Sequence, residues 1–288
     1  MLTSGSANGV RRLRQEDLEF LPYFNKTMYE ARELTYQAGP KTLLHRVSLA
    51  ARPGEVLAIV GANGAGKSTL LRLLSGEAKP TAGEVLFGGI ALADWPPAAL
   101  ARRRAVLTQQ HTLALAFQVR ELVLLGRYPH FGGQPTAHDY AVVAAALDLV
   151  GLRHLAEREY PTLSGGEQQR AQLARVLAQV WEVENAFLLL DEPLTGLDLR
   201  HQHQTLAVAR QLARRGFGVV VVLHDLNLTA QYADQVALLH QGRVVASGPP
   251  AQVFTPDYIH LGFGIEVELL AHPSLGHPLI VPTVSTSF

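Results

Sequence analysis

The chain has 288 residues, of which 48% are hydrophobic and 17% charged, and its 25 basic and 25 acidic residues cancel to a formal net charge of zero. This composition supplies enough apolar residues for a core and excludes a disordered tail protein. A protein that coats nucleic acid usually has an excess of basic residues, which is missing here apart from a local patch at Arg102, Arg103 and Arg104. The absence of cysteine excludes disulfides, iron–sulfur clusters and thiolate zinc sites, and it fits a reducing compartment.

The most apolar runs of the chain are too short to cross a membrane. Residues 56–60, 187–190 and 219–223 fall far short of the roughly 20 residues that a spanning helix needs, and such short runs are typical of buried strands. Residues 1–14 contain no apolar signal-peptide core. We therefore expect a chain that is neither secreted nor anchored by its own segments, so that any role at a membrane comes through a partner.

The first third of the chain predicts strands followed by half of a βαβ unit. Residues 1–30 show no clear periodicity, and we expect them to form a mobile N-terminal extension. Strand patterns follow over 31–36 and 47–51. The aliphatic run 56–60 leads into a glycine-rich turn and a helical pattern. Strand, turn and helix in this order predict an α/β core.

The middle of the chain has a different character. Residues from about 95 to 165 carry helical patterns and a loop rich in Gly and Pro, and we expect a helical insertion between two halves of the core. The core resumes with the strand runs 187–190 and 219–223, each followed by a helical stretch. Residues 265–288 contain scattered Pro, Ser and Thr, and we expect them to form a loose C-terminal tail.

A glycine-rich loop follows the first buried strand. Residues 61–68 read Gly-Ala-Asn-Gly-Ala-Gly-Lys-Ser and match the pattern G-x-x-x-x-G-K-[S/T] between a strand and a helix. Such glycines let backbone N–H groups wrap a phosphate, and the helix N-terminus favours the anion. Lys67 is expected to reach the β- and γ-phosphates, and the Ser68 hydroxyl to ligate Mg²⁺. A chance match is the alternative, which the flanking strand and helix disfavour. The predicted ATP-binding residues of this segment are Gly61, Asn63, Gly64, Ala65, Gly66, Lys67, Ser68 and Thr69.

Two acidic residues follow another buried strand. The run 187–190 delivers Asp191 and Glu192 to its carboxyl end, which we expect to lie beside the phosphate loop. Asp191 suits a contact to Mg²⁺, mainly through water, and Glu192 suits a general base for the attacking water. Alone, the pair is equally compatible with a strand that ends in a solvated acidic turn; a neighbouring phosphate loop favours the catalytic interpretation.

Residues 163–170, Leu-Ser-Gly-Gly-Glu-Gln-Gln-Arg, begin another predicted helix. Ser164 and Glu167 form a capping box. Gly165 and Gly166 expose backbone N–H groups in the first turn, so this helix start is a second candidate anion site. Most Ser-x-x-Glu strings are ordinary caps, and that is the alternative interpretation of these residues taken alone.

The whole octapeptide, with the phosphate loop and the Asp-Glu strand, resembles the motif set of the ATP-binding-cassette (ABC) ATPases. The resemblance covers roughly residues 31–250, and the motifs follow the family's order. It implies an ATPase that uses ATP and Mg²⁺. It also implies an α/β fold within residues 31–264: a P-loop NTPase (RecA-like) core, an antiparallel β subdomain and an inserted α-helical subdomain.

The resemblance assigns roles to further residues. Tyr36 is similar to the aromatic residue that stacks on adenine in this family. Gln109 matches the glutamine that touches Mg²⁺ or the lytic water, with Gln110 as the alternative register. Asp198 belongs to the loop that crosses the dimer interface, although this chain reads Thr-Gly-Leu-Asp where the family often has Ser-Ala-Leu-Asp. His224 matches the switch histidine that senses the γ-phosphate.

The family resemblance also implies partners. In this family the signature segment, here residues 164–167, binds the ATP held by the other subunit of a dimer. One phosphate loop and one signature per chain therefore imply a homodimer. The chain is similar to the separate ATPase subunit of an importer. Such a subunit docks on two permease subunits at the cytoplasmic face of the bacterial inner membrane, with a substrate-binding protein as an indirect partner and no nucleic acid.

A finer resemblance concerns the cargo. Residues 125–130, Leu-Gly-Arg-Tyr-Pro-His, resemble a segment of the iron-siderophore, haem and vitamin B12 importer ATPases, and residues 168–181 are most similar to the haem group. We therefore expect an ATPase that powers haem uptake, with siderophore or vitamin B12 uptake as alternatives. A polar helix-to-loop junction is the plain interpretation of 125–130, and the twelve histidines show no haem or metal cluster.

Two other classes compete with an importer. A soluble cassette ATPase of translation or DNA repair usually carries two cassettes or a long coiled-coil insertion, and a P-loop switch protein would lack the signature. The sequence also leaves open whether the apolar residues Leu113, Leu115, Phe117 and Val119 are core of the helical subdomain or a docking surface for a permease helix.

Overall fold

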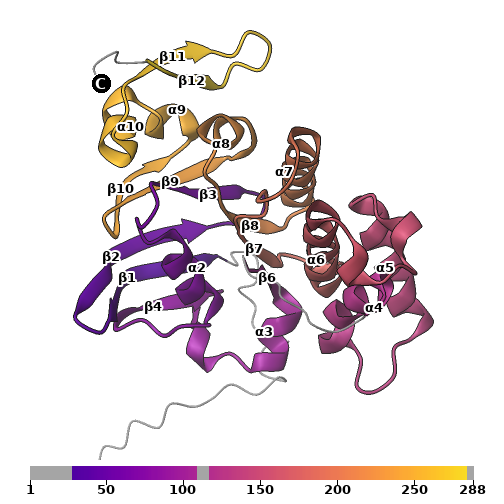
Figure 1. Ribbon diagram of the computed structural model, residues 1–288. Coiled ribbons are helices and arrows are strands. Elements are labelled where there is room, and N and C mark those ends of the chain that lie inside the picture. The colour runs from indigo at the N-terminus through magenta and orange to yellow at the C-terminus, as the bar shows by residue number, and fades with distance from the viewer. Residues whose placement is uncertain (1–27, 109–116, 284–288) are drawn as a thin grey trace, which may run out of the picture.

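The computed structural model describes residues 28–108 and 117–283. The described part contains a six-stranded sheet, a four-stranded sheet, a region of helices and a two-stranded hairpin near the C-terminus (Figure 1). This is the mixed α/β architecture that the sequence predicts.

The six-stranded sheet lies at the centre. Its strands are β3 (Val56–Val60), β6 (Arg104–Leu107), β7 (Phe187–Asp191), β8 (Gly218–Val222), β9 (Gln235–His240) and β10 (Arg243–Gly248). They follow the order β10-β9-β3-β8-β7-β6, and all pairs are parallel except β10 with β9. Every residue of β3, β7 and β8 is buried. Both faces of this sheet are covered, which explains the continuous apolar runs of these strands.

Alternating side chains of the central strands enter two separate cores. In β3, Leu57 and Ile59 join the core that contains α2 (Lys67–Ser75), whereas Val56, Ala58 and Val60 join the core covered by the helices after residue 117. The central sheet therefore holds both halves of the molecule together.

A four-stranded antiparallel sheet covers the α2 side. It consists of β1 (Tyr29–Ala38), β2 (Lys41–Ala51), β4 (Ala82–Phe87) and β5 (Ile90–Ala91), in the order β2-β1-β4-β5. Phe87 of β4 contacts Phe187 of β7 edge to face, with ring centroids 5.7 Å apart. This sheet is the antiparallel β subdomain that the family resemblance implies.

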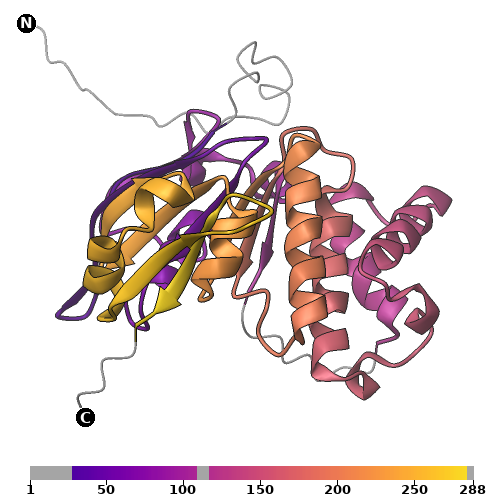
Figure 2. The same cartoon turned by 90° about the horizontal axis from the view of Figure 1, so that it is seen from above.

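The helix α6 (Gly165–Val180) connects the helical region to the main sheet. It packs against α4 (Val119–Leu124), the 3₁₀ helix η3 (Leu125–His130) and α5 (Ala137–Leu149), and also against β6. Figures 1 and 2 show α4 and α5 beyond α6 as seen from the sheet, and α7 (Leu199–Arg214) beside α6. The remaining helices are η2 (Leu92–Asp94), α3 (Pro97–Arg103), η4 (Arg153–Leu155), η5 (Tyr160–Thr162), α8 (Leu226–Tyr232), α9 (Pro250–Val253) and α10 (Pro256–Phe263).

The expected start of the helical insertion at about residue 95 is wrong. α3 leads directly into β6, which pairs with β7 at the edge of the main sheet. Ala105 and Leu107 of β6 are fully buried. A strand of four residues is too short to show a period of its own, so the helical patterns on either side concealed it.

The expected loose tail after residue 265 is also wrong. β11 (Val267–Ala271) and β12 (Pro278–Pro282) form an antiparallel hairpin. Val267 and Ile280 are buried in the larger core. Each strand buries only this one side chain and β12 has proline at both ends, so the sequence carries little strand signal there.

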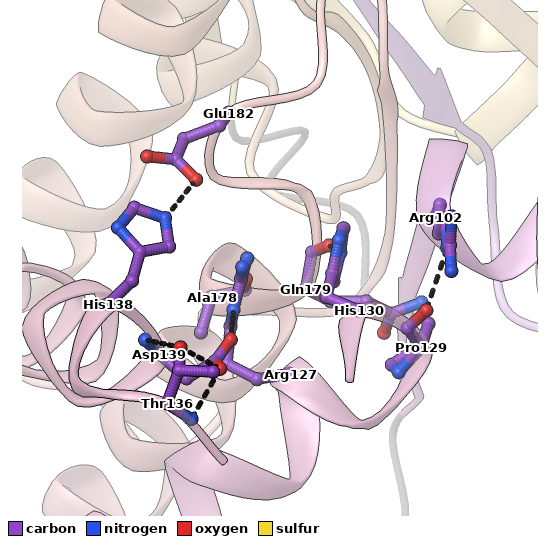
Figure 3. A network of polar contacts seen from close by, with 10 residues as sticks. All are labelled: Arg102, Arg127, Pro129, His130, Thr136, His138, Asp139, Ala178, Gln179 and Glu182. Carbon is purple, nitrogen blue, oxygen red and sulfur yellow. Dashed lines mark hydrogen bonds and ion pairs between the residues drawn. The ribbon is translucent and has the colours of Figure 1, made fainter. Parts of the chain in front are cut away.

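A buried ion pair holds the helical region together (Figure 3). Arg127 of η3 and Asp139 of α5 lie 3.0 Å apart, with side chains only 4% and 5% exposed. Arg127 also donates to the Ala178 carbonyl of α6, and Thr136 donates to Asp139 from its backbone N–H and its hydroxyl. Burial opposes ionisation of Asp139, but the hydrogen bonds from Thr136 and Arg127 outweigh it and lower its pKa to about 2.

The same turn is braced against α3 and β6. Arg102 Nε donates to the Pro129 carbonyl at 2.7 Å, and His130 Nε2 lies 2.6 Å from the Gln179 carbonyl. The Gln179 side chain donates to the Arg104 carbonyl at 3.0 Å. Residues 125–130 are therefore more than a polar junction: they join α6 to the edge of the main sheet (Figure 3).

Replacing Asp139 with asparagine should lower the free energy of unfolding by about 3–5 kcal/mol, because Arg127 stays buried and charged without its partner. Asp148→Asn is the matched control, since Asp148 also lies on α5 and pairs with Arg153 at 3.1 Å, but with both side chains more than half exposed. It should cost no more than about 1 kcal/mol. Urea unfolding of both variants measures the difference, and equal losses would contradict the special weight of the buried pair.

The contribution of Asp139 should also depend on pH. Its folded-state pKa of about 2 lies below the roughly 3.9 of an unfolded aspartate. Its stabilisation is therefore present above about pH 4 and is lost as the pH falls through about 2. The difference in the free energy of unfolding between wild type and Asp139→Asn should therefore shrink as the pH falls from about 4 to about 2.

Candidate functional site

The glycine-rich loop of residues 61–66 joins β3 to α2. Gly61 has a φ of +152°, and a Cβ there would lie 2.2 Å from the Leu239 carbonyl oxygen. Gly64 and Gly66 have φ angles of +78° and +107°, which glycine adopts without strain. Gly66 caps α2 with no side-chain hydrogen bond, and the first turn of α2 contains no acidic residue. The N-terminus of α2 is thus suited to an anion.

Lys67 lies over this loop. Its Nζ donates to the carbonyls of Gly61 at 2.8 Å and Ala62 at 3.0 Å, and the residue is only 5% exposed. Burial lowers the pKa of Lys67, and the nearby charges of Glu192 and Asp191 act in the opposite direction. The loop therefore surrounds a largely buried positive charge, which a phosphate would neutralise.

Two oxygen-bearing side chains that could ligate a cation lie close together at the carboxyl end of β7. Ser68 Oγ donates to Asp191 Oδ1 at 3.4 Å. Asp191 is 7% exposed, and burial together with the charge of Glu192 raises its pKa. A hydroxyl beside a carboxylate is a donor set that Mg²⁺ accepts. No group of three or more His, Asp or Glu residues suited to a metal occurs within residues 28–108 and 117–283.

Glu192 and His224 face each other across two strand ends. His224 Nε2 lies 2.7 Å from Glu192 Oε1, with the glutamate side chain 15% exposed and the histidine 46%. Glu192 has a φ of +47°, a left-handed conformation that non-glycine residues rarely adopt and that clusters at functional sites. Both residues line a hollow of about 200 Å³, together with Thr195, Gln202 and Asp225. A water molecule in this hollow would have a carboxylate within reach.

The signature segment forms the cap of α6 that the sequence predicts. The Glu167 carboxylate accepts from the Ser164 backbone N–H and hydroxyl, both at 2.8 Å, and these bonds lower the pKa of Glu167. Gly165 and Gly166 occupy the first turn. In the described part of the chain, no hydrogen bond or ion pair joins these residues to the loop of residues 61–66. The two candidate anion sites are therefore separate.

Asp198 caps α7 next to this segment. Its Oδ1 accepts from the His201 backbone N–H at 2.9 Å and contacts His201 Nδ1 at 2.7 Å, and the backbone bond lowers the pKa of Asp198. A Cβ on Gly166 would lie 3.4 Å from the Leu197 side chain, so the signature segment packs against the loop that precedes α7. The Asp198 side chain is 66% exposed.

Sequence reasoning missed two glutamines that brace the segment after Glu192. Gln169 Nε2 donates to the Pro193 carbonyl at 3.4 Å, and Gln202 Nε2 to the Leu197 carbonyl at 3.0 Å. No local signal points to this role, because a glutamine on a helix surface is usually solvated.

Other predicted residues stand as follows. Tyr36 lies on β1, half-buried against the core that contains α2. Gln109, like Gln110, Leu113 and Leu115, lies outside the described residues. Val119 is fully buried, so the core interpretation is right for it, whereas Phe117 is half-buried.

Comparison with known proteins identifies the family. The ABC transporter family model matches residues 44–195. The Hemin import ATP-binding protein HmuV of Gloeobacter violaceus is 54% identical over 263 residues, covering 90% of this chain and 96% of that protein. The protein of that name from Pseudomonas aeruginosa is 49% identical over 255 residues, covering 88% and 99%. The chain therefore belongs to the ABC transporter ATPase family.

Solved structures agree on the fold. A chain of an inward-facing metal-chelate-type ABC transporter matches with a TM-score of 0.76 at 28% identity, covering 91% of this chain and 99% of that chain. A bacterial Atm1-family ABC exporter with ATP bound also matches, with a TM-score of 0.70 at 26% identity, covering 82% and 41%. The same fold thus occurs in an exporter, so the fold alone does not give the direction of transport. None of the helices among the described residues has the length and apolarity to span a membrane.

Gly61→Ala should weaken ATP binding, because the new Cβ would lie 2.2 Å from the Leu239 carbonyl oxygen and the loop would have to move. Strain of about 1–3 kcal/mol corresponds to roughly 5- to 150-fold weaker binding. Gly133→Ala is the control, since nothing lies within 4 Å of a Cβ there. Calorimetric titration with ATP measures the affinity, and an unchanged affinity in Gly61→Ala would show that the loop tolerates the displacement.

Proposed function

We propose that this ABC ATPase powers the import of haem through a separate membrane permease. The observation that carries the proposal is the identity of about half the residues, over nearly the full length of both chains, to relatives named hemin import ATP-binding proteins. Iron-siderophore and vitamin B12 uptake are the alternatives that the cargo test must separate.

The site supports hydrolysis of ATP by an attacking water. Lys67 and the N-terminus of α2 would bind the phosphates. The Glu192 carboxylate would accept a proton from water while the water oxygen bonds to the γ-phosphorus. The bond between the γ-phosphorus and the β–γ bridging oxygen would break in the same step. His224, 2.7 Å from Glu192, would orient that carboxylate and sense the γ-phosphate. Tyr36 is proposed to stack on the adenine.

The donor set of Ser68 and Asp191 fits Mg²⁺, and Gln109 is the proposed third contact. When bound, Mg²⁺ supplies charge neutralisation at the β- and γ-phosphates. Burial and the charge of Glu192 raise the pKa of Asp191, and a bound cation would offset both effects.

The working unit is proposed to be a head-to-tail homodimer. Each chain has one phosphate loop, and its signature residues 164–167 make no bond to that loop within the described part. Two copies would complete each other's sites, with Asp198 at the interface. In the cell, we propose that the dimer docks on two permease subunits at the cytoplasmic face of the bacterial inner membrane and that a substrate-binding protein delivers haem from outside.

The proposal is tested by purifying the chain from solubilised membranes and reconstituting it with the permease that co-purifies. Proteoliposomes should take up haem when ATP is enclosed with the ATPase, and should take up neither a ferric siderophore nor vitamin B12. Uptake of one of these instead would replace haem as the cargo. Failure to recover any polytopic membrane protein would contradict the importer role.

Glu192→Gln should retain ATP binding and lose turnover by about 10²–10⁴-fold, because the amide keeps the shape of the side chain but cannot act as a base. The variant should accumulate as an ATP-bound dimer, which gel filtration with ATP detects. Phosphate release within about threefold of wild type would remove Glu192 from the role of general base.

Mixing two inactive variants should restore activity if the signature works in trans. A dimer of one Lys67→Ala chain and one Ser164→Arg chain keeps one intact phosphate loop opposite one intact signature. The mixture should therefore hydrolyse more ATP than either parent alone. No gain, with mixed dimers verified by affinity tags, would place the signature in the same site as its own phosphate loop.

A further inference from the structure

An asparagine of α8 bonds the C-terminal hairpin through its side chain. Asn227 Oδ1 accepts from the Ile280 backbone N–H at 2.8 Å, and Asn227 Nδ2 donates to the Ile280 carbonyl at 3.2 Å. One side-chain amide thus pairs with both main-chain polar groups of one residue in β12, as a neighbouring strand would. Asparagine suits this role because its amide presents a donor and an acceptor side by side.

Apolar packing fixes the hairpin at the same place. Ile280 is 5% exposed and belongs to the core that also contains Leu223 and Leu228, which lie just before α8 and within it. β12 also contacts α8. The hairpin and the first turn of α8 are therefore held together by a core contact and by two hydrogen bonds.

The first turn of α8 follows the proposed switch histidine directly. Asp225 caps α8 by accepting from the Leu228 N–H at 2.8 Å, and the Thr229 hydroxyl donates to the Asp225 carbonyl at 2.7 Å. Asn227 lies within this capped turn, three residues after His224. A rotation of the turn about the end of β8 would move the His224 ring away from Glu192.

We propose that Asn227 is a positioning residue for His224: its paired hydrogen bonds to Ile280 use the C-terminal hairpin as a fixed support for α8, and α8 holds His224 Nε2 against Glu192. The inference rests on the proposed ATPase function and extends it to residues 267–282, which contain none of the family motifs.

Steady-state ATP hydrolysis by Asn227→Ala tests the proposal. We expect kcat to fall about tenfold, since small misplacement of a catalytic group is costly, and the KM for ATP to stay within about twofold, since the phosphate loop is untouched. Binding of a non-hydrolysable ATP analogue gives the number of competent sites per chain, and kcat is expressed per competent site. A partly unfolded preparation therefore cannot imitate the effect.

Ile280→Val is the matched control. It removes one buried methylene from the same contact and keeps both backbone groups that Asn227 bonds, so the melting temperature should fall while kcat per site stays at the wild-type value. If Ile280→Val loses kcat as Asn227→Ala does, loosening the hairpin packing alone accounts for the loss, Asn227 has no positioning role of its own, and the proposal is overturned.

Asn227→Asp covers the case in which Asn227→Ala does not fold. It keeps the side-chain volume and the acceptor for the Ile280 N–H, but places a carboxylate oxygen against the Ile280 carbonyl, so kcat per site should fall again. A kcat within about twofold of wild type in the folded variants overturns the inference. Wild-type protein that hydrolyses no ATP overturns the proposed function itself, and the inference with it.

Discussion

The parallel register of three neighbouring strands is the constraint on which the candidate site depends. Ile59 of β3 and Asp191 of β7 both lie level with Val222 of β8. Just beyond these positions the chain reaches the phosphate loop, Glu192 and His224. Three segments that are distant in sequence therefore meet at the carboxyl ends of these strands. Ladder hydrogen bonds set their separation, and a slip of one residue would turn each strand's side chains to the wrong core.

The surroundings of Glu192 hold it in a conformation that it would not adopt alone. A positive φ on a non-glycine residue persists only where neighbouring structure over-determines it. Here the preceding strand is fully buried, His224 contacts the carboxylate, and Gln169 fixes the carbonyl of the following Pro193. Helix α6, which carries Gln169, thereby contacts the segment that follows Glu192.

The segment of residues 125–130 shows why a resemblance to a cargo class need not mark a cargo site. Arg127 is committed to a buried ion pair, and His130 contacts a carbonyl of α6. Gly126 lies so close to α6 that a Cβ would be 2.1 Å from the Arg175 carbonyl oxygen. These residues determine how the helical region is mounted on α6.

The sequence alone determined the features whose hydrogen bonds close within a few residues. Residues 61–68 and the Ser164–Glu167 capping box were predicted, because loop, cap and helix period are local properties of the chain. The Asp191-Glu192 pair was predicted from the buried strand run before it, whereas its contacts with Ser68 and His224 are tertiary. Tertiary structure alone decided that residues 104–107 form an edge strand, that Arg127 pairs with Asp139, and that Asn227 meets Ile280. A four-residue strand has no period to detect, and a contact between residues far apart depends on how the cores pack, which neighbouring residues do not encode.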